Sequence, residues 1–113
     1  MSRNITYVPV TVADGGTTSG AVDTSEHEVV GIYLPTGLDG TTVAFTASPA
    51  QSDADQPFVA VRNAAGAYSQ TVAAGAYQAI DPLLLAGARW VKVVVAAQLG
   101  AYTAQLALRR LGA

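Results

Sequence analysis

RWVKVVVAA (residues 89–97) and YTAQLALRR (residues 102–110) are the two runs that decide the fold class of this chain. Both alternate with a period of two, which is the spacing of a β-strand with one buried face. In the first run the uniformly apolar face is made of valines, which we expect in the core: Val91, Val93 and Val95. In the second run the alternating apolar positions are Tyr102, Ala104, Leu106 and Leu108. Its Ala, Gln, Leu and Arg residues also suit a helix over 102–111, but the period favours a strand.

Shorter β-type runs, separated by Gly, Pro, Asp and Ser, precede this segment. They cover residues 5–13, 27–35, 41–48, 58–63, 67–74 and 75–80. The turn NAAG (residues 63–66) predicts a hairpin with a positive φ at Gly66. Pro9 cannot donate a backbone hydrogen bond, so the first run belongs at a sheet edge or at a bulge.

Together these runs predict an all-β fold: a single antiparallel β-sandwich of jelly-roll type with about seven to nine strands. One short helical turn is expected near residues 81–87. At 113 residues the chain is one domain, 1–113, with residues 1–10 as an edge strand or an arm.

The alternation along residues 27–35 predicts which side chains lie on each face of this strand. Strict alternation puts Val30, Ile32 and Leu34 on one face of the strand. The opposite face then holds Val29, Gly31 and Tyr33. Because a turn over 36–40 follows, we expect residues 27–35 and 41–48 to be consecutive antiparallel strands.

Composition excludes several classes of function. The six basic residues form no run, so nothing predicts nucleic-acid binding. The absence of cysteine removes disulfides, thiolate chemistry and zinc–thiolate sites. The stretch MSRNITYVPV has no apolar h-region, so no signal peptide is expected. The apolar window over 79–97 is interrupted by Asp81, Pro82, Arg89 and Lys92, so no membrane span is expected.

The polar residues offer no catalytic constellation. His27, the single imidazole, is expected to be an exposed or half-buried strand residue, because a metal site needs several ligands. Asp53 and Asp55 form a D-x-D in a polar loop, which indicates either a solvated loop or a cation site. We therefore expect no enzyme, no catalytic residue, no cofactor and no assigned metal ligand.

DPLLLAG (residues 81–87) predicts a single helical turn. Asp81 suits the N-cap, Pro82 the first position and Gly87 the position after the turn. Successive helical residues point about 100° apart, so the three leucines cannot all face the core. The run is either a core plug or, in part, a partner contact. Trp90 shares the outer face of its strand and is a partner anchor, a stacking surface or a ring covered by a loop.

The order of turn and strand motifs resembles that of small structural proteins of tailed bacteriophages. The matching stretches are Gly31 to Pro35, Phe45 to Ser48, Val72 to Gly75 and Asp81 to Lys92. The resemblance covers about residues 27–110, and its motifs mark fold rather than an active site. In that group small sandwiches serve as capsid decoration (cement) proteins or as fibre components.

The resemblance implies a decoration protein that binds and stabilises the assembled major-capsid lattice. Its partners would be the major capsid protein and neighbouring copies of itself as a homo-oligomer, with neither nucleic acid nor membrane bound. The protein would be made in the host cytoplasm and reside on the capsid surface of the virion. The alternative is a carbohydrate- or cell-surface-binding module of a head or tail fibre. The candidate contact residues are Tyr7, Val8, Pro9, Leu84 and Trp90. Deletion of residues 1–10 is expected to weaken capsid binding and leave the sandwich folded.

Overall fold

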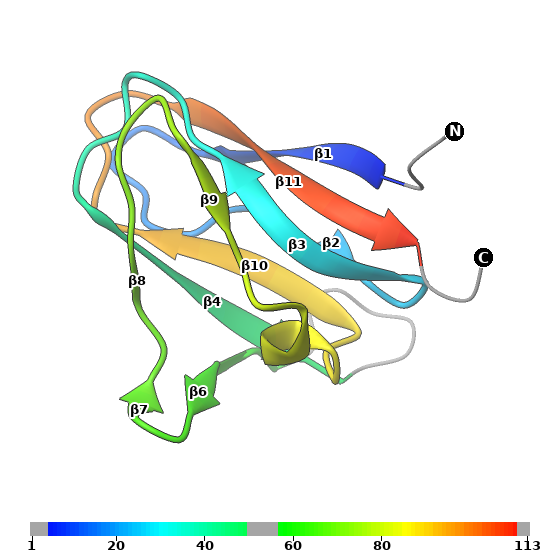
Figure 1. Cartoon of the computed structure of the whole chain (residues 1–113). Coiled ribbons are helices and arrows are strands. Elements are labelled where there is room, and N and C mark those ends of the chain that lie inside the picture. The colour runs from blue at the N-terminus through cyan, green and yellow to red at the C-terminus, as the bar shows by residue number, and fades with distance from the viewer. Residues whose placement is uncertain (1–4, 50–56, 111–113) are drawn as a thin grey trace.

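Two antiparallel sheets pack face to face in the computed structural model, which describes residues 5–49 and 57–110 (Figure 1). Sheet A has the order β1 (Ile5–Val12), β11 (Tyr102–Arg110), β3 (His27–Tyr33), β9 (Tyr77–Ala79). Sheet B has the order β2 (Val22–Asp23), β10 (Trp90–Val95), β4 (Thr42–Ser48), β5 (Val59–Ala60), and β8 (Gln70–Thr71) also pairs with β4. A separate hairpin joins β6 (Arg62–Asn63) to β7 (Gly66–Ala67). The helical element among the described residues is a 3₁₀ turn, η1 (Pro82–Leu85).

The strand order is that of a jelly roll. The described residues form eleven strands. If β5 and β8, which both pair with β4, count as one position and the separate β6–β7 hairpin is set aside, consecutive positions lie in opposite sheets everywhere except between β4 and β5. This interleaving of two sheets is the double Greek key of the jelly roll. Counted in this way, the described residues give eight positions, within the expected range. Residues 27–35 and 41–48 form consecutive strands, as predicted, but the two strands do not pair with each other, because β3 and β4 belong to different sheets.

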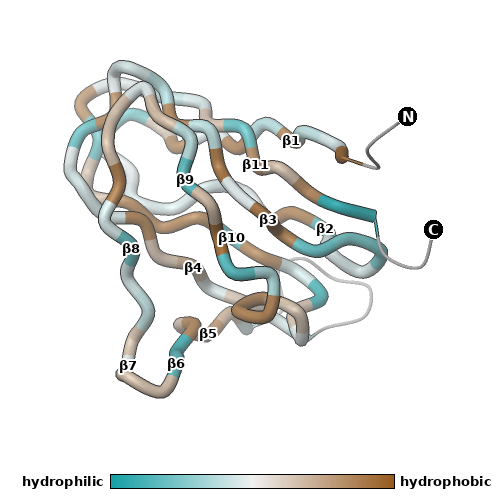
Figure 2. The backbone as a smooth tube through the Cα atoms, viewed as in Figure 1, coloured by the Kyte–Doolittle hydropathy of each residue, from teal (hydrophilic) through white to brown (hydrophobic). Residues whose placement is uncertain are grey.

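The two runs that decided the fold class behave as predicted. Val91, Val93 and Val95 of β10 are buried, and so are Tyr102, Ala104, Leu106 and Leu108 of β11. The strand reading of 102–110 is therefore confirmed and the helical alternative is wrong. Figure 2 shows hydrophobic segments along the strands of both sheets, where the inward residues of the two layers form one core.

The faces of β3 differ from the prediction because the strand contains a β-bulge. Ala107 of β11 pairs with Gly31, but the next residue, Leu108, pairs with Val29, so Val30 has no opposite residue. The extra residue reverses the alternation, and Val29 rather than Val30 enters the core beside Ile32. Val30 is displaced to the outer face of sheet A, where its carbonyl accepts a hydrogen bond from the Ile80 amide at 3.0 Å.

β1 lies at the edge of sheet A, as Pro9 predicted. It pairs with β11 over its whole length and buries Val10 and Val12. Removing residues 1–10 would take away Val10 and most of this ladder. The expectation that the sandwich stays folded without them therefore needs correction.

The predicted turn chemistry is confirmed at two places. The β6–β7 hairpin forms with Gly66 at φ 119°, and it projects from one end of the sandwich (Figure 1). In η1, Asp81 is the N-cap and accepts a hydrogen bond from the Leu83 amide at 3.0 Å. Gly87 follows the C-cap Ala86, as expected for the position after the turn, but it does not take a positive φ.

One residue, Gln98, joins three loops at the opposite end of β10 through its side chain and its backbone. The side chain of Gln98 is 1% exposed. Its Nε2 donates to the carbonyls of Asp39 at 2.9 Å and Ala96 at 2.7 Å, and its Oε1 accepts from the Asp39 amide at 3.0 Å. The Gln98 backbone bonds to Gly15 and Gly16 of a third loop. Every polar atom of this side chain is thus used to hold the loops together.

Candidate functional site

Three exposed tyrosines gather on the outer face of sheet A, from three different strands. We call Tyr7 of β1, Tyr33 of β3 and Tyr77 of β9 the tyrosine cluster; they are 54%, 47% and 45% exposed. The Tyr33 and Tyr77 rings lie 4.5 Å apart between centroids, and Tyr7 meets Tyr33 edge-on at 5.9 Å. The pairing register produces this cluster. Tyr33 lies directly opposite Tyr77, and Tyr7 lies opposite Ala107 of β11, the strand that separates β1 from β3.

Small residues beneath the rings make room for the cluster. Ala107 of β11 and Gly31 of β3 are adjacent in the sheet. A Cβ on Gly31 would coincide with the end of the Tyr77 ring, so only glycine lets the ring lie this close to the backbone. The Tyr77 hydroxyl donates to the Val30 carbonyl at 3.3 Å, the same carbonyl that accepts the Ile80 amide. The result is a depression of about 250 Å³ lined by Ile5, Tyr7, Val30, Tyr33, Tyr77 and Ala107.

The depression carries no formal charge. Burial raises the pKa of the Tyr77 hydroxyl, and Tyr33 and Tyr7 raise it further, so the phenol stays neutral at physiological pH. Arg109, which follows Ala107 on the same face of β11, forms an ion pair with Glu28 of β3. A ligand in the depression would therefore meet aromatic surface, phenolic hydroxyls and aliphatic groups rather than a free cation or anion.

A second surface lies at the end of the sandwich where η1 precedes β10. The leucines divide as the helical geometry predicted: Leu85 is buried, Leu84 is half-buried against the core, and Leu83 is 80% exposed. Beside them is an apolar depression of about 240 Å³ lined by Ala47, Ser48, Pro49, Val59, Leu84, Leu85, Gly87 and Ala88. We call Leu83, Leu84 and the exposed Val59 the η1 patch; η1 is one of the hydrophobic stretches in Figure 2.

Trp90 lies on the outer face of sheet B and is partly covered. The Arg89 guanidinium sits 6.0 Å from the centroid of its ring. Its indole Nε1 is buried without a hydrogen-bond partner within residues 5–49 and 57–110. On the same face the Lys92 ammonium lies 4.3 Å from the Phe58 ring centroid. These cation–π contacts occupy aromatic surface that a stacking ligand would need.

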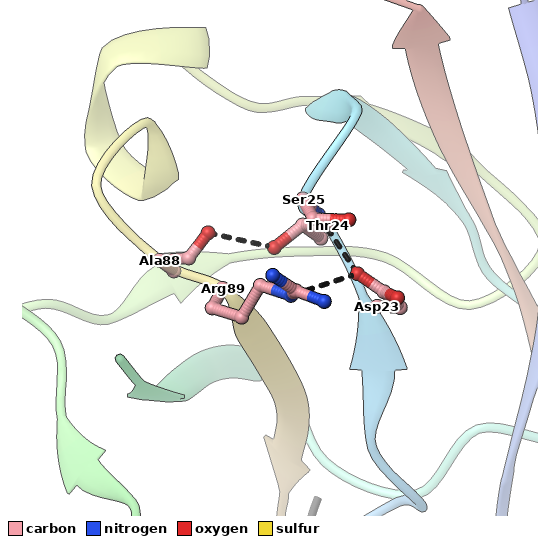
Figure 3. Close-up of polar contacts among 5 residues, drawn as sticks. All are labelled: Asp23, Thr24, Ser25, Ala88 and Arg89. Atoms are coloured by element: carbon pink, nitrogen blue, oxygen red, sulfur yellow. Dashed lines mark hydrogen bonds and ion pairs between the residues drawn. The ribbon is translucent and has the colours of Figure 1, made fainter. Parts of the chain in front are cut away.

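Polar contacts fix the start of β10 to the β2–β3 corner (Figure 3). The Thr24 hydroxyl donates to the Ala88 carbonyl at 2.9 Å, and the Thr24 amide donates to the Arg89 carbonyl at 2.8 Å. Asp23 accepts from the Ser25 amide at 2.9 Å, which lowers its pKa; Arg89, whose Nε lies 3.5 Å away, lowers it further. These contacts hold the corner in place, so we assign them a structural role.

The structure separates the five predicted contact residues. Tyr7 and Pro9 are exposed on the outer face of sheet A, Leu84 belongs to the η1 patch, and Trp90 lies on sheet B. Val8 points inward and packs against the core. Sequence reasoning missed Tyr33 and Tyr77. The alternation along residues 27–35 placed Tyr33 on one face of its strand but could not identify the neighbouring strands. The pairing of β3 with β9 and β11, and of β11 with β1, brings the three rings together.

Neither a metal-binding group nor a membrane-spanning helix is found within residues 5–49 and 57–110. Within the described ranges, no group of three or more His, Asp and Glu side chains is placed to hold a metal ion. His27 is half-buried at the start of β3, as expected, and Asp53 and Asp55 lie outside the described residues. No helix in the described part of the chain is long and apolar enough to cross a membrane.

Comparisons of the chain with protein families, with curated proteins and with solved structures find no match. The resemblance to small phage structural proteins therefore stays a prediction from the turn and strand motifs.

Proposed function

We propose that this protein is a structural component of a tailed-phage virion that binds the assembled capsid and reinforces it. The observation that carries the proposal is the η1 patch, an apolar contact surface on a jelly-roll domain. The charged fraction of the sequence, 12%, is low, as expected for a surface that is covered in an assembly. The motif resemblance to phage structural proteins points the same way.

The mechanism of reinforcement is mass action. A protein that binds the assembled lattice better than free subunits shifts the equilibrium toward the lattice. Burying one exposed Leu such as Leu83 contributes about 1.5–3 kcal/mol per contact, and each contact is repeated at every occupied position of the shell. Weak individual contacts therefore suffice to stabilise a large assembly.

Co-sedimentation with shells of the major capsid protein encoded in the same genome tests this function. Leu83→Asp places a charge in the contact and should abolish co-sedimentation. Leu99→Asp is the matched control, because Leu99 is 92% exposed in the loop at the other end of β10; this variant should bind like the wild type. Wild-type protein that fails to bind shells would refute the function, and equal binding by Leu83→Asp would refute the patch.

A second candidate, the saccharide-binding module, is favoured by one observation. Exposed aromatic side chains do gather on a single surface, as such a module requires, but they are the tyrosine cluster rather than Trp90. Trp90 is half-buried and engaged by Arg89. The two candidates use different faces of the domain, so they can be tested separately and can both hold.

A further inference from the structure

We propose that the depression framed by Tyr7, Tyr33 and Tyr77 is a binding site for a neutral saccharide. This inference rests on the second candidate function, which it deepens, and does not depend on capsid attachment. It assigns the ligand class from three properties of the site: its aromatic walls, its phenolic hydroxyls and its lack of charge.

Aromatic walls and hydroxyls suit a sugar ring. A pyranose has an apolar face of C–H groups and a rim of hydroxyls, and tyrosine offers an apolar ring with a polar end. All three rings are about half exposed, so they present surface to a ligand. The Tyr77 hydroxyl already uses its proton on the Val30 carbonyl, which leaves its oxygen lone pairs as acceptors for a sugar hydroxyl.

The lack of charge in the depression argues against a nucleotide, the main alternative ligand that stacks on aromatic side chains. Nucleotides also stack on tyrosines, but their phosphates need cations nearby. The residues that line the depression are all uncharged, and Arg109 is engaged by Glu28. Sulfated or sialylated glycans would meet the same lack of a cation. The volume, about 250 Å³, lies below the range of pockets for drug-sized ligands and suits one ring rather than a long chain.

The bulge and Gly31 make the site a built feature of the fold. The bulge places Val30 on the outer face, where it lines the depression, and the missing Cβ of Gly31 admits the end of the Tyr77 ring. Gly31→Ala should therefore push Tyr77 off the sheet without touching the ligand directly. A flat strand without these two features would hold Tyr77 elsewhere and leave the depression unformed.

The test is a titration of the isotope-labelled full chain with maltose, cellobiose and diacetylchitobiose, followed by amide chemical shifts. We expect at least one disaccharide to shift the amides of Gly31, Tyr77 and Ala107. Tyr77→Ala and Gly31→Ala should each weaken that binding roughly tenfold or more. Tyr77→Phe keeps the ring and should lose less, while Leu99→Ala is the control and should bind like the wild type.

Three results would overturn the assignment: no shift with any of the three sugars, shifts that map away from the cluster, or unchanged binding by Tyr77→Ala. Preferential binding of a sialylated or sulfated glycan would overturn the neutral class. Shell co-sedimentation of Tyr77→Ala, expected to be unchanged, separates this proposal from capsid attachment. Amide spectra with wild-type dispersion show that each variant is folded.

Discussion

Replacement of Gln98 by leucine should destabilise the domain strongly, because the buried side-chain amide of this residue links its own loop to the loop of Asp39. The leucine keeps roughly the same volume but removes three hydrogen bonds. The amide and carbonyl of Asp39 and the carbonyl of Ala96 then lose their partner. A buried group left unpaired costs about 1–3 kcal/mol.

The expected loss of stability is smaller than the sum of three such costs for fully buried unpaired groups. Asp39 is half-buried and Ala96 is exposed, so water can replace part of the hydrogen bonding that the Gln98 side chain gives to their backbone groups. We expect a loss of about 2–3 kcal/mol in the free energy of unfolding. For a domain of this size that corresponds to a melting temperature lower by roughly 8–20 °C.

Urea unfolding followed by fluorescence measures this loss directly, because Trp90 is the only tryptophan of the chain. Gln105→Leu is the matched control: Gln105 is half-buried on the outer face of β11, and its replacement should change stability by no more than about 0.5 kcal/mol. Equal transition midpoints for the two variants would refute the role of the Gln98 side chain in linking its loop to that of Asp39.

Two further predictions concern single side chains. The Tyr102 hydroxyl is buried without a hydrogen-bond partner within the described residues, so Tyr102→Phe should be neutral or stabilising by up to about 1 kcal/mol; a clear fall in melting temperature would contradict this. The pKa of Asp23 is lowered in the folded state, chiefly by the Ser25 amide. Its ionised form therefore stabilises the fold above the unfolded-state pKa, near 4, and that stability is lost as the pH falls through the folded-state pKa. Asp23→Asn should accordingly lose less stability than the wild type between about pH 6 and pH 2, and parallel stability curves would show that the Ser25 contact is unimportant.

Local patterns predicted the elements well because their causes are local. The valines of β10 and the alternation of β11 mark buried faces, Pro9 marks an edge, and the Asp81–Pro82 pair marks a helical start. These features depend on periodicity, on a missing donor or on a cap, all of which can be read in a few neighbouring residues.

The remaining features depend on pairing between distant segments. The bulge at Val30 reverses the faces of β3, and it is visible only in the register against β11. The tyrosine cluster needs β1, β3 and β9 to lie in one sheet, although β1 and β9 are far apart in the chain. The predicted contact residues, Tyr7, Val8, Pro9, Leu84 and Trp90, were taken from the first strand, the helical turn and the outer face of a strand, without knowing which sheet each would join.

Under the proposed function the genome that encodes this chain is that of a tailed phage, and quantitative mass spectrometry of its purified capsids and tails tests this most directly. We predict that the protein is present in the capsid fraction at a copy number comparable with that of the major capsid protein. Its absence from virions, or its presence only in tails at a few copies, would contradict the proposal that this jelly roll reinforces the shell.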